Sequence, residues 1–245
     1  YLLGSSFLLA TVTFICALIC IPDGKSAGAF TQAIFRSNYA IIGMPLILSL
    51  FGESAFTKSA VALAFMMPLY NILAIFALTI PLHKKSGNVL KKAAKNIVKI
   101  PLIIAVFLAV PFSVFNINMP NVAASTLSYL ADIAIPLALL AIGGQFTVKS
   151  LRDNMKLGIS ATILKIIISP LIFTLIAVLL GFRGDNLGIV FIIFGSPTAI
   201  SSYIVAQGMN SDDSLAANIV LLTTVFSAFT IFIGTEVLKS LGLIL

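Results

Sequence analysis

A polar, proline-containing stretch interrupts a hydrophobic segment that is otherwise long enough to cross a membrane. Residues 37–46 read SNYAIIGMPL, and the sequence on both sides is largely apolar. A helix inside a bilayer tolerates such a break only where its freed backbone groups find partners in neighbouring protein or in a water-filled cavity. A second break reads GSP at residues 195–197 and continues into a Ser-Ser-Tyr run. Two interrupted spans in corresponding places indicate a transporter binding site near the membrane midplane.

The composition places the chain among polytopic membrane proteins. Hydrophobic residues make up 60% of its 245 residues and charged residues only 9%. A soluble domain of this length has too little interior to bury so much apolar surface. The net charge of +7 does not indicate nucleic-acid binding, because the positive residues are concentrated in short loops between hydrophobic spans. Cys16 and Cys20 lack the spacing and the histidine neighbours of a metal site, so no metal or cofactor is expected.

The hydrophobic segments predict about eight spans across the ~30 Å hydrocarbon core. We expect them at residues 2–21, 27–51, 57–82, 97–115, 123–146, 155–181, 187–207 and 214–239. Lysines are concentrated in a basic loop at residues 83–96, and short cytoplasmic loops carry the excess of lysine and arginine. This loop is therefore assigned to the cytoplasm. Tyr1 and Leu245 are both assigned to the outer face of the plasma or inner membrane.

The two breaks also predict an internal repeat. When GMP at 43–45 is aligned with GSP at 195–197, the three-span blocks 1–81 and 155–240 correspond. Two further spans precede the second block, so a repeat of five spans predicts that the first two helices are lacking ahead of Tyr1. An odd number of spans in each repeat gives the two copies opposite orientations, which is the inverted-repeat architecture of secondary transporters.

The sequence resembles the auxin efflux carrier family, which includes bacterial organic-acid permeases and plant PIN-type carriers. The resemblance covers nearly the whole chain. It rests on Asn38-x4-Gly43-x-Pro45, on IPLALLAIGG at 135–144, on residues 197–207 and on DSLAANIVL at 213–221.

The resemblance implies an all-α, bile-acid-symporter-like fold. Ten helices would form two inverted five-helix repeats, and two broken helices would cross at the membrane midplane. Residues 1–81 and 155–245 would form a transport domain that moves, as in an elevator mechanism, against a scaffold domain. Residues 97–146 would be part of that scaffold.

The crossing of the broken helices is expected to bind a small organic anion. Unpaired N–H groups and the positive end of a half-helix dipole favour an anion at a helix break. Asn38 adds a neutral amide donor, which costs less to bury than a lysine. The resemblance implies that this position contacts the substrate carboxylate; the alternative is an asparagine that only satisfies the broken backbone. The candidate substrate-binding residues are Asn38, Gly43, Pro45, Ser196, Pro197, Ser201, Ser202, Tyr203 and Gln207.

Three residues within the spans are candidates for coupling to Na+ or H+. A lysine or aspartate at a helix centre costs about 2.5–3.5 kcal/mol on insertion scales, so its presence needs a reason. Lys165 could pair with substrate or stand in for a coupling cation; the structural alternative is a lysine that snorkels to the interface or bonds to backbone carbonyls. Asp132 could take up a proton or cap a local turn, and Asn218 in the last span completes the set. Arg36 is expected at the cytoplasmic entrance.

The sequence therefore predicts a secondary active transporter for a small organic anion, such as a carboxylate or an auxin-like acid, and not an enzyme. It contains no HExxH or GxSxG motif and no pair of membrane aspartates. A sodium-coupled bile-acid-type symporter is the alternative, because it shares the crossed-helix plan. A channel is a weaker alternative, since the polar residues gather at two breaks and not along a continuous pore. The expected surroundings are the lipid bilayer, and a homodimer is a candidate assembly.

Overall fold

The computed structural model of the chain describes residues 1–82, 108, 111–112, 115, 119–145 and 155–244. These parts are almost entirely helical. The elements are α1 Leu2–Cys20, α2 Gly24–Phe35, η1 Tyr39–Gly43, α3 Met44–Leu82, α6 Asn121–Gln145, α8 Met155–Ile163, η2 Leu164–Ile168, α9 Ser169–Leu179, α10 Gly184–Gly195, α11 Ser201–Gly208 and α12 Asp213–Ser240. Within these parts, the only extended pairing is an isolated antiparallel bridge between Ser37 and Thr198.

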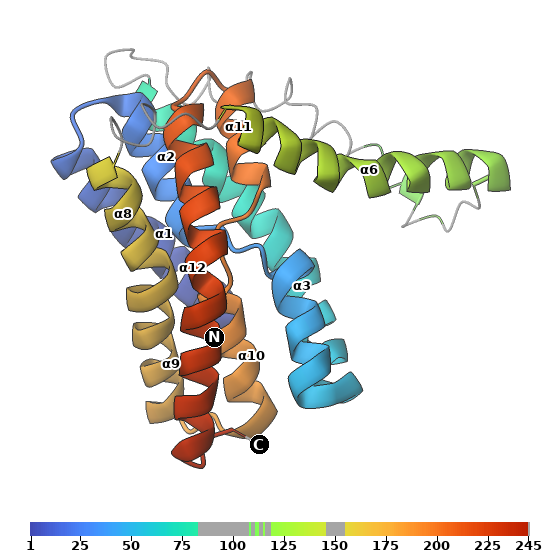
Figure 1. Cartoon of the computed structure of the whole chain (residues 1–245), viewed down its shortest axis with the longest axis vertical. Coiled ribbons are helices and arrows are strands. Elements are labelled where there is room, and N and C mark those ends of the chain that lie inside the picture. Colours follow the sequence, from blue (N-terminus) through green and yellow to red (C-terminus); the bar gives the residue numbers. More distant parts are fainter. Residues whose placement is uncertain (83–107, 109–110, 113–114, 116–118, 146–154, 245) are drawn as a thin grey trace.

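Four helical segments, one of them broken at Gly52, are long and apolar enough to cross a membrane. They are Leu2–Cys20, Tyr39–Leu82, Met155–Leu179 and Asp213–Ser240, and α10 is a shorter apolar helix. Most of these helices run along a common long axis (Figure 1). The prediction of an all-helical, polytopic membrane protein is confirmed. The predicted fourth span, 97–115, and the basic loop at 83–96 lie outside the described residues, apart from a few positions in the span.

Gly52 divides α3 into two helices that run in different directions. Its φ of 79° and ψ of −174° lie in a region that favours glycine, and they interrupt the helical geometry between Phe51 and Glu53. The turn expected at the end of the second span is therefore present. As a result, the short first part of α3 belongs to the interrupted segment, and the long second part returns along the bundle (Figure 1).

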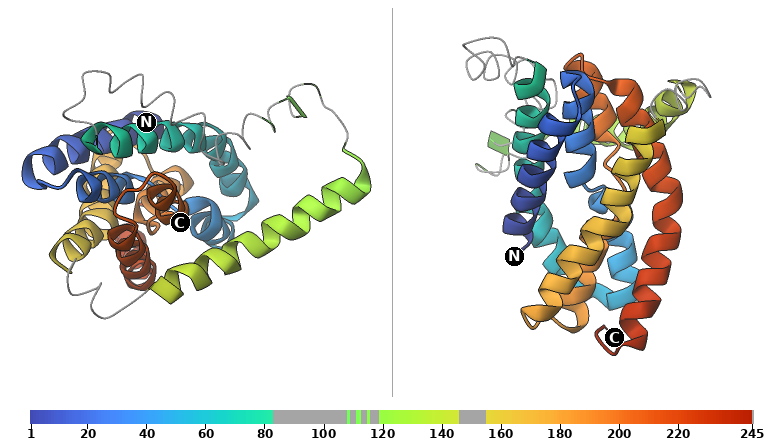
Figure 2. Two further views of the ribbon diagram at one scale, coloured as in Figure 1. Left: turned by 90° about the horizontal axis from the view of Figure 1, so that it is seen from above. Right: turned by 90° about the vertical axis from the view of Figure 1, so that its left-hand side faces the viewer.

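The two termini lie toward the same end of the bundle. The end of α3 and the start of α8 lie at the opposite end, as Figures 1 and 2 show. The chain therefore enters and leaves the segment 83–154 on one side. That the terminal side faces outward remains a prediction.

Helix α6 contacts this bundle chiefly through α12. It forms where the fifth span was expected, but it runs across the long axis instead of along it (Figure 1). Side chains such as Val122, Tyr129 and Leu140 are largely exposed along it. In this structure α6 therefore contributes little to the packing of the bundle, and its place as a span of the scaffold stays a prediction.

Close packing between α2 and α3 holds the first broken segment in place. A Cβ atom on Gly28 would lie 2.9 Å from the carbonyl oxygen of Ala77, and one on Gly24 would lie 2.4 Å from that of Pro81. Only glycine permits the two backbones to approach so closely. On the other side, the rings of Phe173 in α9 and Phe194 in α10 stack with their centroids 4.5 Å apart. The two interrupted segments are thus each fixed against a long helix.

Candidate functional site

The two interrupted segments cross at the points where the backbone of each leaves its helix and is extended. One break joins α2 to η1 through residues 36–38, and the other joins α10 to α11 through residues 196–200. The Asn38 N–H donates to the Pro197 carbonyl at 2.8 Å, and the Ala199 N–H donates to the Arg36 carbonyl at 3.2 Å. Each break therefore supplies the hydrogen bonds that the other has lost, as an interruption inside a membrane requires.

The predicted alignment of Gly43–Pro45 with Gly195–Pro197 is wrong. Gly43 is the last residue of η1, and Pro45 lies in the first turn of α3. The helical segment has already begun at Tyr39, so Pro45 lies inside it, just after the π-helical turn η1, and kinks of this kind are typical of proline and of π-helical turns. Pro197, in contrast, lies in the extended segment itself. The residue that pairs with Thr198 is Ser37, so the first break precedes the position expected from the sequence.

Asn38 has a buried side chain whose amide is not used to cap the break. Its side chain is 4% exposed, and Nδ2 has no hydrogen-bond partner. The backbone of Asn38 is satisfied separately, because its N–H is bonded to Pro197 and its carbonyl accepts from the Ile42 N–H at 3.0 Å. The alternative that Asn38 only repairs the backbone is therefore not supported by its contacts. An unpaired amide donor faces the interior beside the start of η1.

Arg36 is buried at the crossing, although the sequence indicated the cytoplasmic entrance. The residue is only 3% exposed. Its Nη2 donates to Ser201 Oγ at 2.8 Å and to Asn71 Oδ1 at 3.1 Å, whereas Nη1 is buried without a partner. Arginines are usually found at the ends of membrane spans, which is why the sequence indicated the entrance. The burial of Arg36 depends on acceptors in α3 and α11, which are distant in sequence.

No carboxylate compensates the charge of Arg36 in the described part of the chain. The two ion pairs found there join Lys58 to Asp185 and Lys239 to Glu236. Each acidic residue that the structure describes is exposed or half-buried. A buried guanidinium without an anion is costly, since desolvation of a charge amounts to several kcal/mol. The crossing therefore has the electrostatic requirement of an anion site.

The remaining residues predicted at the second break divide into three groups. Ser201 bonds to Arg36, and the hydroxyl of Ser202 is buried without a partner. Ser196 Oγ donates to the Ile192 carbonyl, so it caps α10. Tyr203 and Gln207 lie further along α11, where Gln207 Nε2 donates to Tyr203 OH at 3.1 Å and Gln207 is exposed. Among these residues, Ser201 is the one with a hydrogen bond to the Arg36 side chain.

Lys165 is fully buried in the π-helical turn η2. Its side chain is 0% exposed and its Nζ has no hydrogen-bond partner, so the alternative of a snorkelling lysine is wrong. Single π-helical turns inside α-helices often occur at functional sites. Asn218 is buried in α12 as well, whereas Asp132 is exposed on α6 and does not join the bundle. The three candidates for coupling therefore do not form one cluster.

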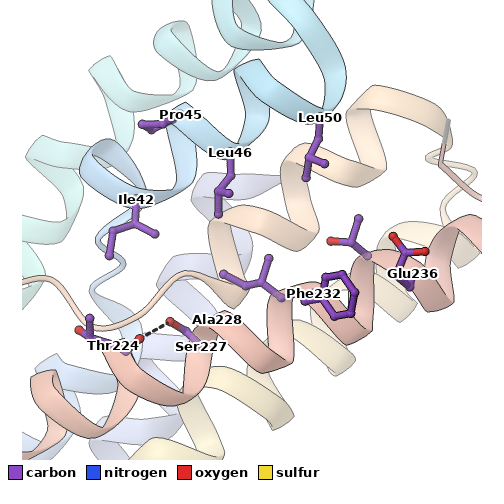
Figure 3. A pocket seen from close by; sticks show the side chains of 11 residues that line it. Ile42, Pro45, Leu46, Leu50, Thr224, Ser227, Ala228, Phe232 and Glu236 are labelled. Atoms are coloured by element: carbon purple, nitrogen blue, oxygen red, sulfur yellow. Dashed lines mark hydrogen bonds between the residues drawn. The ribbon is translucent and has the colours of Figure 1, made fainter.

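An apolar pocket lies beside the crossing, between the first part of α3 and α12. It has a volume of about 520 Å³. Figure 3 shows Ile42, Leu46 and Leu50 on one wall, facing side chains of α12. Pro45, predicted as a substrate-binding residue, lines this pocket and not the break itself.

These features define a class of protein. A polytopic helical bundle in which two interrupted helices cross, with unpaired buried donors at the crossing, has the design of a membrane transporter. The profile of the membrane transport protein family matches residues 1–234, so the chain belongs to this family, the auxin efflux carriers.

Two relatives are similar over most of the chain. One is an uncharacterized transporter from Methanothermobacter thermautotrophicus, 24% identical over 218 residues, which cover 89% of this chain and 70% of the relative. The other is an uncharacterized transporter from Methanocaldococcus jannaschii, 24% identical over 215 residues, which cover 86% of this chain and 68% of the relative. The family resemblance seen in the sequence is confirmed.

Proposed function

We propose that this protein is a secondary active transporter for a small organic anion, and that the anion binds at the crossing of the two interrupted segments. The observation that carries the proposal is the pair of buried residues Arg36 and Asn38, each with a donor group that has no partner. The two residues flank Ser37, which forms the bridge to the second break. A carboxylate offers acceptors to both.

Backbone electrostatics support an anion at the same place. Helices η1 and α11 both begin at the crossing, so their first N–H groups and the positive ends of their dipoles are directed toward it. Hydrogen bonds to a charged group contribute about 1.5–3 kcal/mol each. A bound carboxylate would also compensate the charge of Arg36, which a neutral ligand would not do.

The arrangement of the helices supports alternating access. Helices α1, α2 and α3 contain the first break, and α8–α9, α10, α11 and α12 contain the second, in the same order and with opposite direction along the bundle (Figure 1). We assign these two sets to inverted five-helix repeats. In this scheme residues 1–81 and 155–245 form the transport domain, which moves against a scaffold that includes 97–146.

The same proposal includes the membrane location, the coupling ion and the assembly of the protein. The protein would lie in the cell membrane with both termini outside, and would couple transport to Na+ or H+. The bilayer and a small anion are its expected partners, and a homodimer is its candidate assembly.

Uptake into proteoliposomes tests this function. Labelled malonate, malate and an indole acid would be supplied in turn, with sodium and pH gradients applied separately. We expect saturable uptake of at least one acid. Substitutions Asn38→Ala and Arg36→Gln should each raise KM by about tenfold to a hundredfold, the equivalent of one charged hydrogen bond. The exposed residues Asn186 and Arg183 provide the matched controls Asn186→Ala and Arg183→Gln.

The outcomes separate the alternatives. Uptake that requires sodium would favour a bile-acid-type symporter, and uptake that is unaffected by sodium would favour an auxin-carrier-like mechanism. An unsaturable conductance would indicate a channel. If no acid is taken up, or if both variants at the crossing transport as well as the parent, the anion site proposed here is wrong. Melting temperatures of the variants in detergent would exclude unfolding as the cause of a loss.

A further inference from the structure

Lys165 lies in the part of the bundle where the half-helices α2 and α10 both end. The turn η2, which contains it, packs against α2, α10 and α12. Helix α2 ends at Phe35 and α10 ends at Gly195, directly before the two breaks. A Cβ atom on Gly195 would lie 3.9 Å from the Cβ atom of Pro170, in the first turn of α9 after η2. The turn that carries Lys165 is therefore close to the carbonyl ends of the two half-helices.

The neighbours of Lys165 connect it to the last turn of α2. Ala33 of α2 and Ile219 of α12 belong to one buried apolar cluster, and Leu164, which precedes Lys165, packs against that cluster. The Ala33 carbonyl also accepts the hydroxyl of Thr198 in the second break at 2.7 Å. The turn of α2 that holds the second break is thus part of the same packing layer as η2.

The crossing has two sides of opposite electrostatic character. Helices η1 and α11 begin there, whereas α2 and α10 end there with the negative ends of their dipoles. In transporters with broken helices, the N-terminal ends face an anionic substrate, and the C-terminal ends and freed carbonyls hold the coupling cation. Lys165 is on the second of these sides. An ammonium group at this position would supply the positive charge that a bound sodium ion supplies elsewhere.

Lys165 is also the group near the crossing whose charge can change. Among the residues that the structure describes, Arg36 and Lys165 are the buried ones with charged side chains, and the Lys165 Nζ has no hydrogen-bond partner there. A guanidinium does not lose its proton in proteins, whereas a buried lysine amine can. The other titratable residues on the elements packed against η2 are exposed or half-buried, namely Lys25, Lys156, Asp185, Asp213, Glu236 and Lys239.

We propose that Lys165 is the resident cation of the crossing and the carrier of the coupling proton, so that each anion is transported with one H+ and without Na+. This inference rests on the proposed function. A carboxylate at the crossing favours the ammonium form of Lys165, which takes its proton from the water on the side where the anion entered. The anion and the proton leave together on the other side, and the amine returns uncharged.

The net charge at the crossing is then the same in both directions of movement. Arg36 keeps its positive charge throughout. In the loaded state the ammonium of Lys165 and the carboxylate of the substrate cancel, and in the empty state both charges are absent. Neither state therefore carries an additional charge across the bilayer, where moving an unpaired charge is costly.

Calorimetric titration of the purified protein tests the linkage between anion and proton. The probe is the acid among malonate, malate and the indole acid that gives saturable uptake. It would be titrated between about pH 7 and pH 9.5, where it stays ionised because carboxyl groups titrate at about 4. Buffers of different ionisation enthalpy give the number of protons taken up with each anion. We expect proton uptake on binding, and a Kd that rises with pH by at most about tenfold per pH unit.

Substitutions that remove the amine locate the effect. Lys165→Met and Lys165→Gln should bind the acid with a smaller dependence of Kd on pH and with no proton uptake from this residue. A lysine needed only for packing would change the melting temperature and leave the proton uptake as in the parent. Lys156 is exposed on α8, so Lys156→Met is the matched control and should keep the full proton uptake.

Uptake into sodium-free proteoliposomes tests the coupling itself. With an acidic exterior, the parent and Lys156→Met should accumulate the acid above the level of protein-free liposomes, which corrects for passive entry. Lys165→Met should show no accumulation above that level.

Failure of this inference differs from failure of the proposed function. If binding takes up no proton, or if accumulation requires a sodium gradient, Lys165 is not the coupling cation. The anion site still stands in that case, provided that Asn38→Ala weakens binding. Accumulation by Lys165→Met in a pH gradient would also overturn the inference. If none of the three acids binds at any pH, both the inference and the proposed function are wrong.

Discussion

Ser37 and Thr198 face each other across the crossing, and the hydroxyl of each caps the helix that precedes the other. Ser37 Oγ donates to the Ile193 carbonyl in α10 at 2.6 Å, and Thr198 Oγ1 donates to the Ala33 carbonyl in α2 at 2.7 Å. Together with the backbone bridge between these residues, this exchange satisfies the carbonyl ends of both half-helices. The crossing is thus fixed from within by residues of the two breaks themselves.

Removing one of these hydroxyls should destabilise the protein. Thr198→Val keeps the shape of the side chain but leaves the buried Ala33 carbonyl without its donor, which costs about 1–3 kcal/mol. Thermal unfolding in detergent would measure the loss. Thr11 makes the same kind of bond to the Phe7 carbonyl on the exposed face of α1, so Thr11→Val is the control. Equal melting temperatures for the two variants would refute the role of the exchange.

The breaks could be predicted from the sequence because their signals are local. Proline, glycine and serine inside an apolar span disfavour a continuous membrane helix wherever they occur. The register of the breaks could not be predicted, because a proline in an apolar stretch is compatible with a break and also with a position inside a helical segment, where Pro45 lies after η1. Only the pairing of Ser37 with Thr198, which depends on the fold, decides between these readings.

The charge at the site is a second property that the sequence did not predict. Arg36 precedes a Ser-Asn pair near the end of an apolar stretch, a position typical of interfacial arginines. Its acceptors, Asn71 and Ser201, come from α3 and α11, so the burial of Arg36 follows from tertiary structure alone. Asn38, in contrast, can be singled out from the break and from the family motif. Its side chain is buried, and its contact with a carboxylate stays a prediction.

Gly43 should tolerate no larger residue. A Cβ atom there would lie 2.8 Å from Ser196 Oγ and 2.8 Å from Tyr39 Cβ, closer than normal contacts allow. Gly43→Ala should therefore push the two broken segments apart and reduce both stability and anion uptake. Melting temperature and uptake would be measured together. Gly208→Ala, at a helical glycine with no atom within 4 Å, should behave like the parent, and similar behaviour of Gly43→Ala would contradict the prediction.

Lys165 should lower the free energy of unfolding of the protein and yet be needed for transport. Its buried amine has no hydrogen-bond partner, so Lys165→Met, which keeps the length of the side chain, should stabilise the protein by about 1–4 kcal/mol. If Lys165 takes part in coupling, the same variant should bind acids normally but lose uptake driven by an ion gradient. The exposed residue Lys156 provides the control Lys156→Met. A lower melting temperature for Lys165→Met would show that a hidden partner satisfies the amine.

Asp23, in the turn between α1 and α2, should make stability depend on pH at the acidic end. Its carboxylate accepts from the Ser26 N–H at 2.9 Å and from the Ser26 hydroxyl at 2.7 Å. These bonds, the backbone one first, lower the pKa of Asp23 below its usual value of 3.8. The Ser26 hydroxyl also contacts Asp212, which caps α12, so this turn links the starts of two helices.

The sign of the effect follows from the direction of that shift. A carboxyl group whose pKa is lower in the folded state stabilises the fold above its unfolded pKa, and it loses this contribution as the pH falls through the folded value. Asp23→Ala should therefore cost about 1 kcal/mol at neutral pH, as expected for an N-cap. The difference from the parent should shrink as the pH is lowered below 3.8. Denaturant unfolding at several pH values would measure it, with Glu53→Ala as a control at an exposed carboxylate. A difference that stays constant with pH would show that Asp23 acts through its shape alone and not through its charge.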